Sequence, residues 1–205
     1  MVKKPAPADR MIEAAMTLAA RRGWRGLTLT EIMAEAGVSM AEAYPQMASK
    51  LAVLDALMAR VDRAVLAEPA EDAGVAPRDR LFDLLMRRFD ALRPYRLGLA
   101  AVMRDLPGDP FHALCAARGL DRSMGWMLRA AGLDGGGLRR AALQKALAGA
   151  YLLAFRRFLA DDSTDLAATM AALDGALRRL ERWTPLLRPA PTPPPKDHAA
   201  PQHNP

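Results

Sequence analysis

The side chains that most often carry chemistry are few and scattered in this sequence. Cys115 is the only cysteine, which excludes an internal disulfide, and it is most simply a small apolar filler. No Ser/His/Asp set or metal-ligand spacing occurs, and the glycines at Gly135–Gly137 do not match a phosphate-binding loop. His198 and His203 lie in a proline-rich segment and have no role assigned. The sequence therefore predicts a protein that is not an enzyme and holds no metal or cofactor.

Large apolar side chains in the second half of the chain form a second candidate set. Methionines and aromatic rings suit an apolar ligand of irregular shape. The candidate ligand-binding residues are Met86, Phe89, Leu99, Met103, Trp126, Met127, Tyr151 and Phe155. The alternative is that the same side chains only fill a helical core. Arg93, Arg96 and Arg104 could meet an anionic group, or form a solvated face.

Composition favours helices and a cytoplasmic protein. Ala, Leu, Arg and Met dominate, and all four are good helix formers. No apolar run approaches the roughly 20 residues that a membrane span needs, and the N-terminus has no signal-peptide core. The net charge of +6 permits nucleic acid as a partner, or peripheral contact with an anionic membrane surface.

The N-terminal residues predict a small helix-turn-helix domain over residues 8–48. A helix over 8–22 carries one apolar stripe. Thr28 and Glu31 then form a capping box that begins a helix over 29–36, and Gly37 ends it. Ser39 and Glu42 repeat the box only two residues later. Two short helices joined by a glycine turn are typical of a helix-turn-helix.

Residues 49–183 predict a larger helical domain for ligand binding and dimerisation. Ser49 caps a helix over 50–66, and residues 68–77 form a linker. Five helices should follow, over 78–92, 95–104, 111–131, 138–160 and 165–183. Gly119 could break the third of them. Residues 184–205 are proline-rich and predict a disordered tail.

The last two predicted helices have the clearest apolar periodicity. Their apolar faces comprise Leu143, Leu147, Ala150, Tyr151, Ala154, Phe155 and Phe158 on one helix and Leu166, Met170, Leu173, Leu177 and Leu180 on the other. Two such helices could pair with a second copy, which predicts a homodimer through residues 138–183. The alternative is that both faces are buried inside one chain.

The first domain closely resembles the DNA-binding region of TetR-family transcriptional regulators. The resemblance covers about residues 10–60 and rests on the Gly23–Trp24 turn, the Thr28–Glu31 cap, the Ala36–Ser39 turn, Tyr44 and Ser49–Lys50. It implies an all-α, TetR-like fold that binds double-stranded DNA. Carried over by position, the base-facing candidates are Met40, Ala41 and Gln46, and the phosphate-contacting candidates are Thr28, Thr30, Ser39, Tyr44 and Lys50.

The third helix departs from that family's pattern. Met40 stands where a basic or small polar residue is usual, and Glu42 is the only charge between Ser39 and Gln46. Pro45 removes a backbone donor from the second turn, so this helix should be kinked or limited to about one turn. Residues 1–60 carry eight bases and six acids, a weak positive balance for binding phosphates.

The second domain resembles the TetR-like lipid-binding proteins of coenzyme Q biosynthesis. The resemblance runs from Arg80 to Glu181 and rests on short motifs at Leu92–Tyr95, Leu106–Pro110, Asp121–Trp126, Ala131–Gly132 and Asp161–Asp174. It implies an isoprenoid lipid in the helical body and a head that no longer binds DNA. The membrane-binding terminal helix of those proteins has no counterpart here.

Three functional hypotheses follow. The first is a dimeric transcriptional regulator whose DNA binding responds to an apolar small molecule in the body. The second is a lipid-binding accessory protein of ubiquinone biosynthesis with a degenerate head. The third is a helical interaction module with neither ligand, which an empty and well-packed body would indicate.

Overall fold

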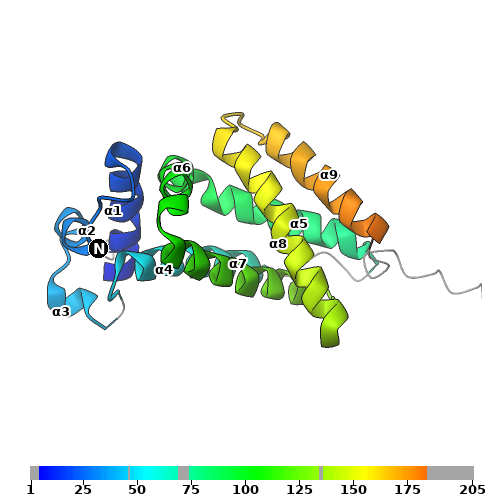
Figure 1. The fold of residues 1–205 in the computed structure, drawn as a ribbon, viewed down its shortest axis with the longest axis horizontal. Coiled ribbons are helices and arrows are strands. Elements are labelled where there is room, and N and C mark those ends of the chain that lie inside the picture. The colour runs from blue at the N-terminus through cyan, green and yellow to red at the C-terminus, as the bar shows by residue number, and fades with distance from the viewer. Residues whose placement is uncertain (1–4, 46, 69–73, 134–135, 184–205) are drawn as a thin grey trace, which may run out of the picture.

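The computed structural model describes residues 5–45, 47–68, 74–133 and 136–183, and in these residues the secondary structure is helical, with turns and loops between the helices (Figure 1). The elements are α1 (Pro7–Arg22), α2 (Leu29–Ala36), α3 (Met40–Ala43), α4 (Lys50–Ala67), α5 (Pro77–Leu92), α6 (Arg96–Asp105), α7 (Pro110–Ala130), α8 (Gly137–Ala160) and α9 (Ala167–Trp183). The all-α prediction is confirmed. Within these residues no helix is long and apolar enough to cross a membrane.

The head consists of α1, α2 and α3, and its turns form where the sequence predicted them. Both capping boxes are present: Thr28 and Glu31 begin α2, and Ser39 and Glu42 begin α3. Gly37 ends α2 with a φ of 58°, a backbone conformation that glycine adopts without strain. Arg10 of α1 donates to the Ala36 (3.0 Å) and Gly37 (2.6 Å) carbonyls. The turn between α2 and α3 is therefore fixed from the first helix.

Helix α3 is a single turn, as Pro45 predicted. It spans only Met40–Ala43, and Tyr44 closes it by donating its backbone N–H to the Met40 carbonyl (2.9 Å). Proline has no N–H with which to continue the helix from Ala41. The prediction for Gln46 falls outside the described residues.

The body helices lie within one to two residues of their predicted bounds. Helix α7 runs unbroken through Gly119, so the break considered there is absent. A 3₁₀ turn at Arg93–Tyr95 joins α5 to α6. Helix α9 begins two residues later than predicted, after a loop held by buried Asp161, which accepts the backbone N–H of Thr169 (2.8 Å). Hydrogen bonds from Ser163 and Thr169 hold the pKa of Asp161 well below its usual range. Residues 69–73 of the predicted linker and the whole predicted tail are outside the described residues.

Helices α8 and α9 pack against each other, and their apolar faces are buried inside the chain. All seven residues predicted for the α8 face are buried, as are Leu166, Leu173 and Leu177. Met170 is 41% exposed and Leu180 is partly buried. Because these faces already contact α5 and each other, they are not the surface that a second copy would cover.

Helix α6 joins the head to the body by packing against α1 (Figure 1). Gly98 allows this approach, because a Cβ atom built there would lie 2.6 Å from the Met16 backbone oxygen. At the end of α6, the Asp105 carboxylate accepts the backbone N–H groups of Trp24 (2.7 Å) and Arg25 (3.0 Å). These two hydrogen bonds lower the pKa of Asp105, so the carboxylate stays charged at neutral pH.

Candidate DNA-binding head and ligand cavity

The predicted DNA contacts fall into two groups in the folded head. Thr30, Met40, Ala41 and Tyr44 are exposed, and Met40 and Tyr44 have exposed fractions of 72% and 86%. Such exposure of large side chains on a short helix is compatible with contact to DNA. The hydroxyls of Thr28 and Ser39 are used at the helix caps, where each bonds the glutamate three residues later. Any phosphate contact by these two hydroxyls competes with their capping role.

Lys50 is held by the head itself. Its ammonium group donates to the backbone carbonyls of Trp24 (3.1 Å) and Arg25 (3.0 Å), and it lies 5.4 Å from the centre of the Trp24 ring. An ammonium has three donors, so one remains for a phosphate. The lysine therefore connects the start of α4 to the Trp24–Arg25 turn, whose backbone N–H groups donate to Asp105.

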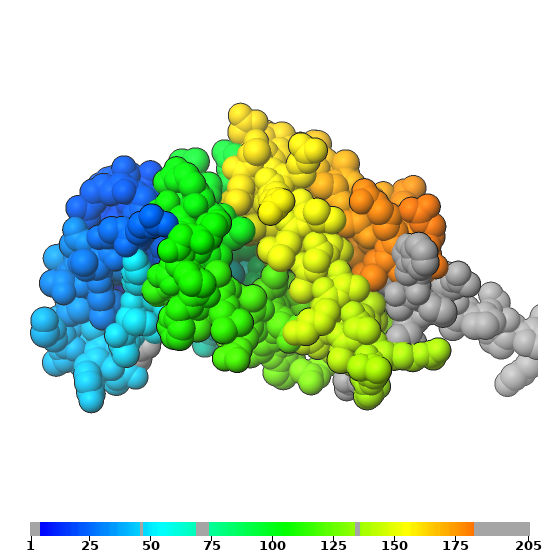
Figure 2. Space-filling view, in the orientation of Figure 1, coloured from blue at the N-terminus to red at the C-terminus, as the bar shows by residue number. Residues whose placement is uncertain are grey.

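A cavity of about 400 Å³ lies in the body between α4, α5, α6, α7 and α8. Figure 2 shows the surface hollowed between the green helices α6 and α7 and the yellow α8. Four of the eight predicted ligand-binding residues line it, namely Leu99, Met103, Tyr151 and Phe155. They share the wall with Leu54 and Met58 of α4, Val102 of α6, and small alanines of α7 and α8.

The other four predicted ligand-binding residues do not line this cavity. Phe89 and Met127 are fully buried core residues, and the Phe89 ring stacks behind Tyr151 with centroids 5.0 Å apart. Met86 is partly buried and packs against the core. Trp126 is 49% exposed and lies on the outer surface beside Arg129. Side-chain type alone did not distinguish a cavity wall from the packing layer behind it.

The predicted arginine cluster is also absent from the cavity. Arg93 pairs with Asp90 on the surface (2.6 Å), and Arg96 reaches the Leu159 carbonyl (3.5 Å). Arg104 is 70% exposed beside Asp105. None of the three lines the cavity, which supports the solvated-face alternative.

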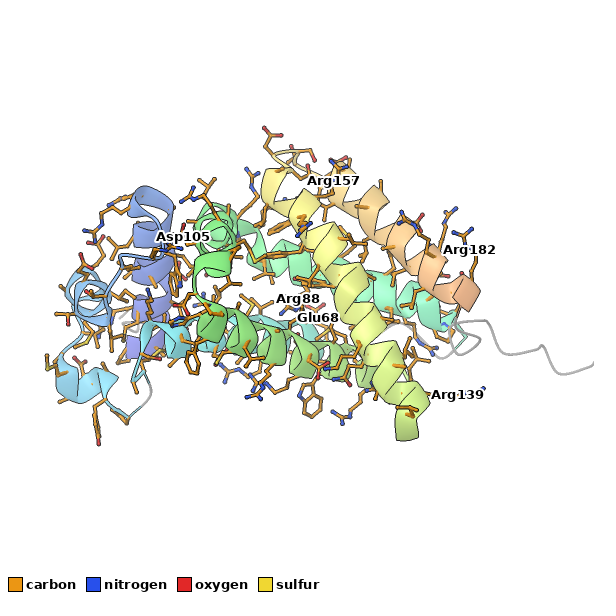
Figure 3. The ribbon with its side chains drawn as sticks, viewed as in Figure 1. Glu68, Arg88, Asp105, Arg139, Arg157 and Arg182 are labelled. Atoms are coloured by element: carbon orange, nitrogen blue, oxygen red, sulfur yellow. The ribbon has the colours of Figure 1, made fainter. Side chains whose placement is uncertain are left out.

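A buried arginine that the sequence analysis missed forms part of the cavity wall. Arg88 is 2% exposed and lies at the centre of the body (Figure 3). Its Nε donates to Asp62 of α4 (3.0 Å), and its Nη1 donates to the Tyr151 hydroxyl oxygen (2.6 Å). Ser123 of α7 donates to the same Asp62 oxygen (2.8 Å). The signal for it was available, since Arg88 occupies the apolar stripe of α5 four residues after Leu84 and four before Leu92.

These features define a class of protein: an all-α chain with a helix-turn-helix head joined to a helical body that contains a cavity. Solved structures share this fold. A TetR transcriptional regulator from Nitrosomonas europaea is 26% identical, with 85% of this chain and 98% of that chain covered and a TM-score of 0.66. A TetR transcriptional regulator from Rhodococcus sp. RHA1 is 20% identical, with 85% and 95% covered and a TM-score of 0.60.

Residues 11–57 match the family model for bacterial regulatory proteins of the tetR family. The head is therefore similar to the N-terminal helix-turn-helix of tetR-family regulators, and the whole chain shares the fold of these two solved regulators. No curated protein matches it. The resemblance of the body to the lipid-binding proteins of coenzyme Q biosynthesis finds no support in these comparisons.

Proposed function

We propose that the chain is a homodimeric regulator whose binding to double-stranded DNA responds to an apolar small molecule held in the body cavity. The observation that supports this proposal is that two helices, α4 and α6, both line the cavity and contact the head. Helix α4 begins against the head at Lys50 and lines the cavity with Leu54 and Met58. Helix α6 lines it with Leu99 and Met103 and packs against α1. A ligand between these helices would therefore change how the head is held.

The outer faces of α8 and α9 are the proposed dimer surface. A shallow hollow between them is lined mainly by small and apolar side chains, including Leu153, Ala168 and Ala171. Arg157 and Arg179 border this hollow, and Figure 3 shows Arg157 on the outside of the molecule. A second copy packed on this hollow would place two heads for two half-sites on DNA.

The proposal is tested by fluorescence anisotropy of the full chain with duplex from its own upstream region, against a scrambled duplex at physiological salt. We expect preferential binding to its own duplex. Equal, weak and salt-sensitive binding to both duplexes would contradict sequence-specific regulation.

Replacing Pro45 with arginine is expected to tighten DNA binding by about tenfold. The substitution restores the backbone donor of the second turn, which lengthens α3, and it adds a base next to the exposed Tyr44. The slope of log K against log salt should also steepen by about 1, as for one added phosphate contact.

The matched control for this substitution is Pro45→Ala, which restores the backbone without the charge. We expect Pro45→Ala to tighten binding less and to leave the salt slope unchanged. If neither variant changes the affinity, α3 does not enter the DNA interface.

Replacing Ala148 with phenylalanine is expected to block the cavity, because Ala148 lines it from α8. The neutral fluorescent probe N-phenyl-naphthylamine should bind the wild-type chain and lose at least tenfold in affinity for this variant. The control is Ala142→Phe, on the exposed side of the same helix, which should bind the probe as the wild type does. Equal binding to both variants would place the probe outside the cavity.

A further inference from the structure

We propose that the cavity selects an uncharged apolar molecule that carries a carbonyl-type oxygen, and that the Tyr151 hydroxyl donates a hydrogen bond to this oxygen. The inference rests on the proposed function, in which the cavity is the effector site. It adds the chemical class of the effector and the residue that recognises it.

The first step is that the O–H group of Tyr151 can donate one further hydrogen bond. Its side chain is 2% exposed, and its hydroxyl oxygen accepts a hydrogen bond from Arg88 (2.6 Å). In the described part of the chain, no acceptor takes the proton of this hydroxyl. Buried donors are nearly always satisfied, so an unmet one on a cavity wall indicates the position of a ligand acceptor.

The second step is that this hydroxyl keeps its proton. Burial raises the pKa of Tyr151 above its ordinary value, so the phenol is neutral at physiological pH. Accepting a hydrogen bond from a guanidinium also polarises the O–H bond, which makes the hydroxyl a stronger donor. Stacking on Phe89, with centroids 5.0 Å apart, fixes the ring from behind.

The third step concerns the charge of the ligand. The two bases on the wall are both paired: Arg88 with Asp62 at 3.0 Å, and Lys145 with Asp121 at 2.8 Å. Asp55 adds a further carboxylate to the lining. An anionic head group would meet no unpaired base on this wall and would lie near carboxylates. An oxygen without charge would meet the O–H that Tyr151 offers inside the cavity, whereas the Lys145 ammonium is paired with Asp121 and its side chain is 70% exposed.

The other lining residues indicate the chemistry of the rest of the ligand. Leu99, Val102 and Met103 of α6 line the cavity together with Phe155 of α8. These side chains offer no hydrogen bond other than through the weak methionine sulfur, so they suit an aliphatic or aromatic body. Of the polar lining residues, Tyr151 and Arg88 are the ones buried from solvent, so we expect polar recognition of the ligand there.

The experiment is a competition against N-phenyl-naphthylamine by three ligands of equal carbon number: methyl hexyl ketone, octane and octanoate. On the wild-type chain we expect the ketone to bind about tenfold more tightly than octane, the factor that one hydrogen bond supplies. Octanoate should bind more weakly than the ketone. Tyr151→Phe should lower ketone affinity to that of octane and leave octane unchanged. Tyr95→Phe removes a hydroxyl that donates to Glu13 outside the cavity, and it should leave all three affinities unchanged.

The outcomes separate this inference from the proposed function. If the ketone and octane bind equally and Tyr151→Phe changes neither, the carbonyl contact is wrong while an apolar site remains. If octanoate binds most tightly, the uncharged class is wrong. If neither the probe nor any of the three ligands binds, the effector site itself is wrong. If circular dichroism shows that Tyr151→Phe does not fold, the wild-type ranking of the three ligands decides alone.

Discussion

Replacing Arg88 with methionine is expected to lower the free energy of unfolding by about 3–5 kcal/mol, the usual cost of removing one partner from a buried ion pair. The arginine is 2% exposed and Asp62 is 15% exposed, so the substitution leaves a carboxylate largely removed from water. Among the described residues, only the hydrogen bond from Ser123 would remain to this carboxylate. Chemical denaturation followed by circular dichroism measures the change.

Two further variants show whether the buried charge is the cause. Adding Asp62→Leu to Arg88→Met should recover most of the lost stability, because the unpaired carboxylate is then gone. Arg93→Met removes the exposed pair with Asp90, whose side chains are 42% and 56% exposed, and an exposed hydrogen bond to the Thr164 carbonyl (2.8 Å). It should cost less than Arg88→Met, about 1 kcal/mol. If Arg88→Met and Arg93→Met lower the free energy of unfolding equally, the buried pair stabilises the chain no more than the exposed pair.

Replacing Gly98 with alanine is expected to destabilise the chain by roughly 1–3 kcal/mol and to weaken DNA binding. The new Cβ atom would lie 2.6 Å from the Met16 oxygen and 3.0 Å from its Cα atom, and backbone atoms of α1 cannot move away without moving the head. Separating α1 from α6 would also strain the hydrogen bonds from Trp24 and Arg25 to Asp105. Thermal unfolding and anisotropy on the upstream duplex measure the two effects.

The control for this substitution is Gly149→Ala, also a glycine inside a helix but with no atom within 4 Å of a built Cβ. There the higher helix propensity of alanine should stabilise the chain by about 0.5–1 kcal/mol. Should both variants prove stabilising, α1 and α6 would not be in close contact in solution.

The sequence predicted the features that depend on neighbours along the chain. The two capping boxes located α2 and α3 because a hydroxyl and a carboxylate three residues apart satisfy the same helix end wherever they occur. Pro45 predicted the short α3 for an equally local reason. The buried face of α8 followed from its 3.6-residue period.

Features that depend on distant segments were missed. Asp105 lies 80 residues from Arg25, and no pattern in the sequence relates the end of α6 to the turn after α1. Side-chain type also made Phe89 and Tyr151 equal candidates for the ligand site, although Phe89 packs behind the wall and Tyr151 lines the cavity. Arg88 was not among the candidates, although its spacing from Leu84 and Leu92 puts it on the buried face of α5.

The single turn of α3 limits how many base pairs the head can contact directly. Four residues at a rise of about 1.5 Å extend for about 6 Å, which is roughly two base-pair steps of DNA. In the proposed homodimer, two heads would then read about four base pairs directly. A four-base-pair sequence recurs by chance about once in every 256 positions, whereas a genome offers at least about a million competing sites. Selective control of one promoter would depend on the shape and deformability of the DNA between the half-sites, which a dimer can sense without touching the bases.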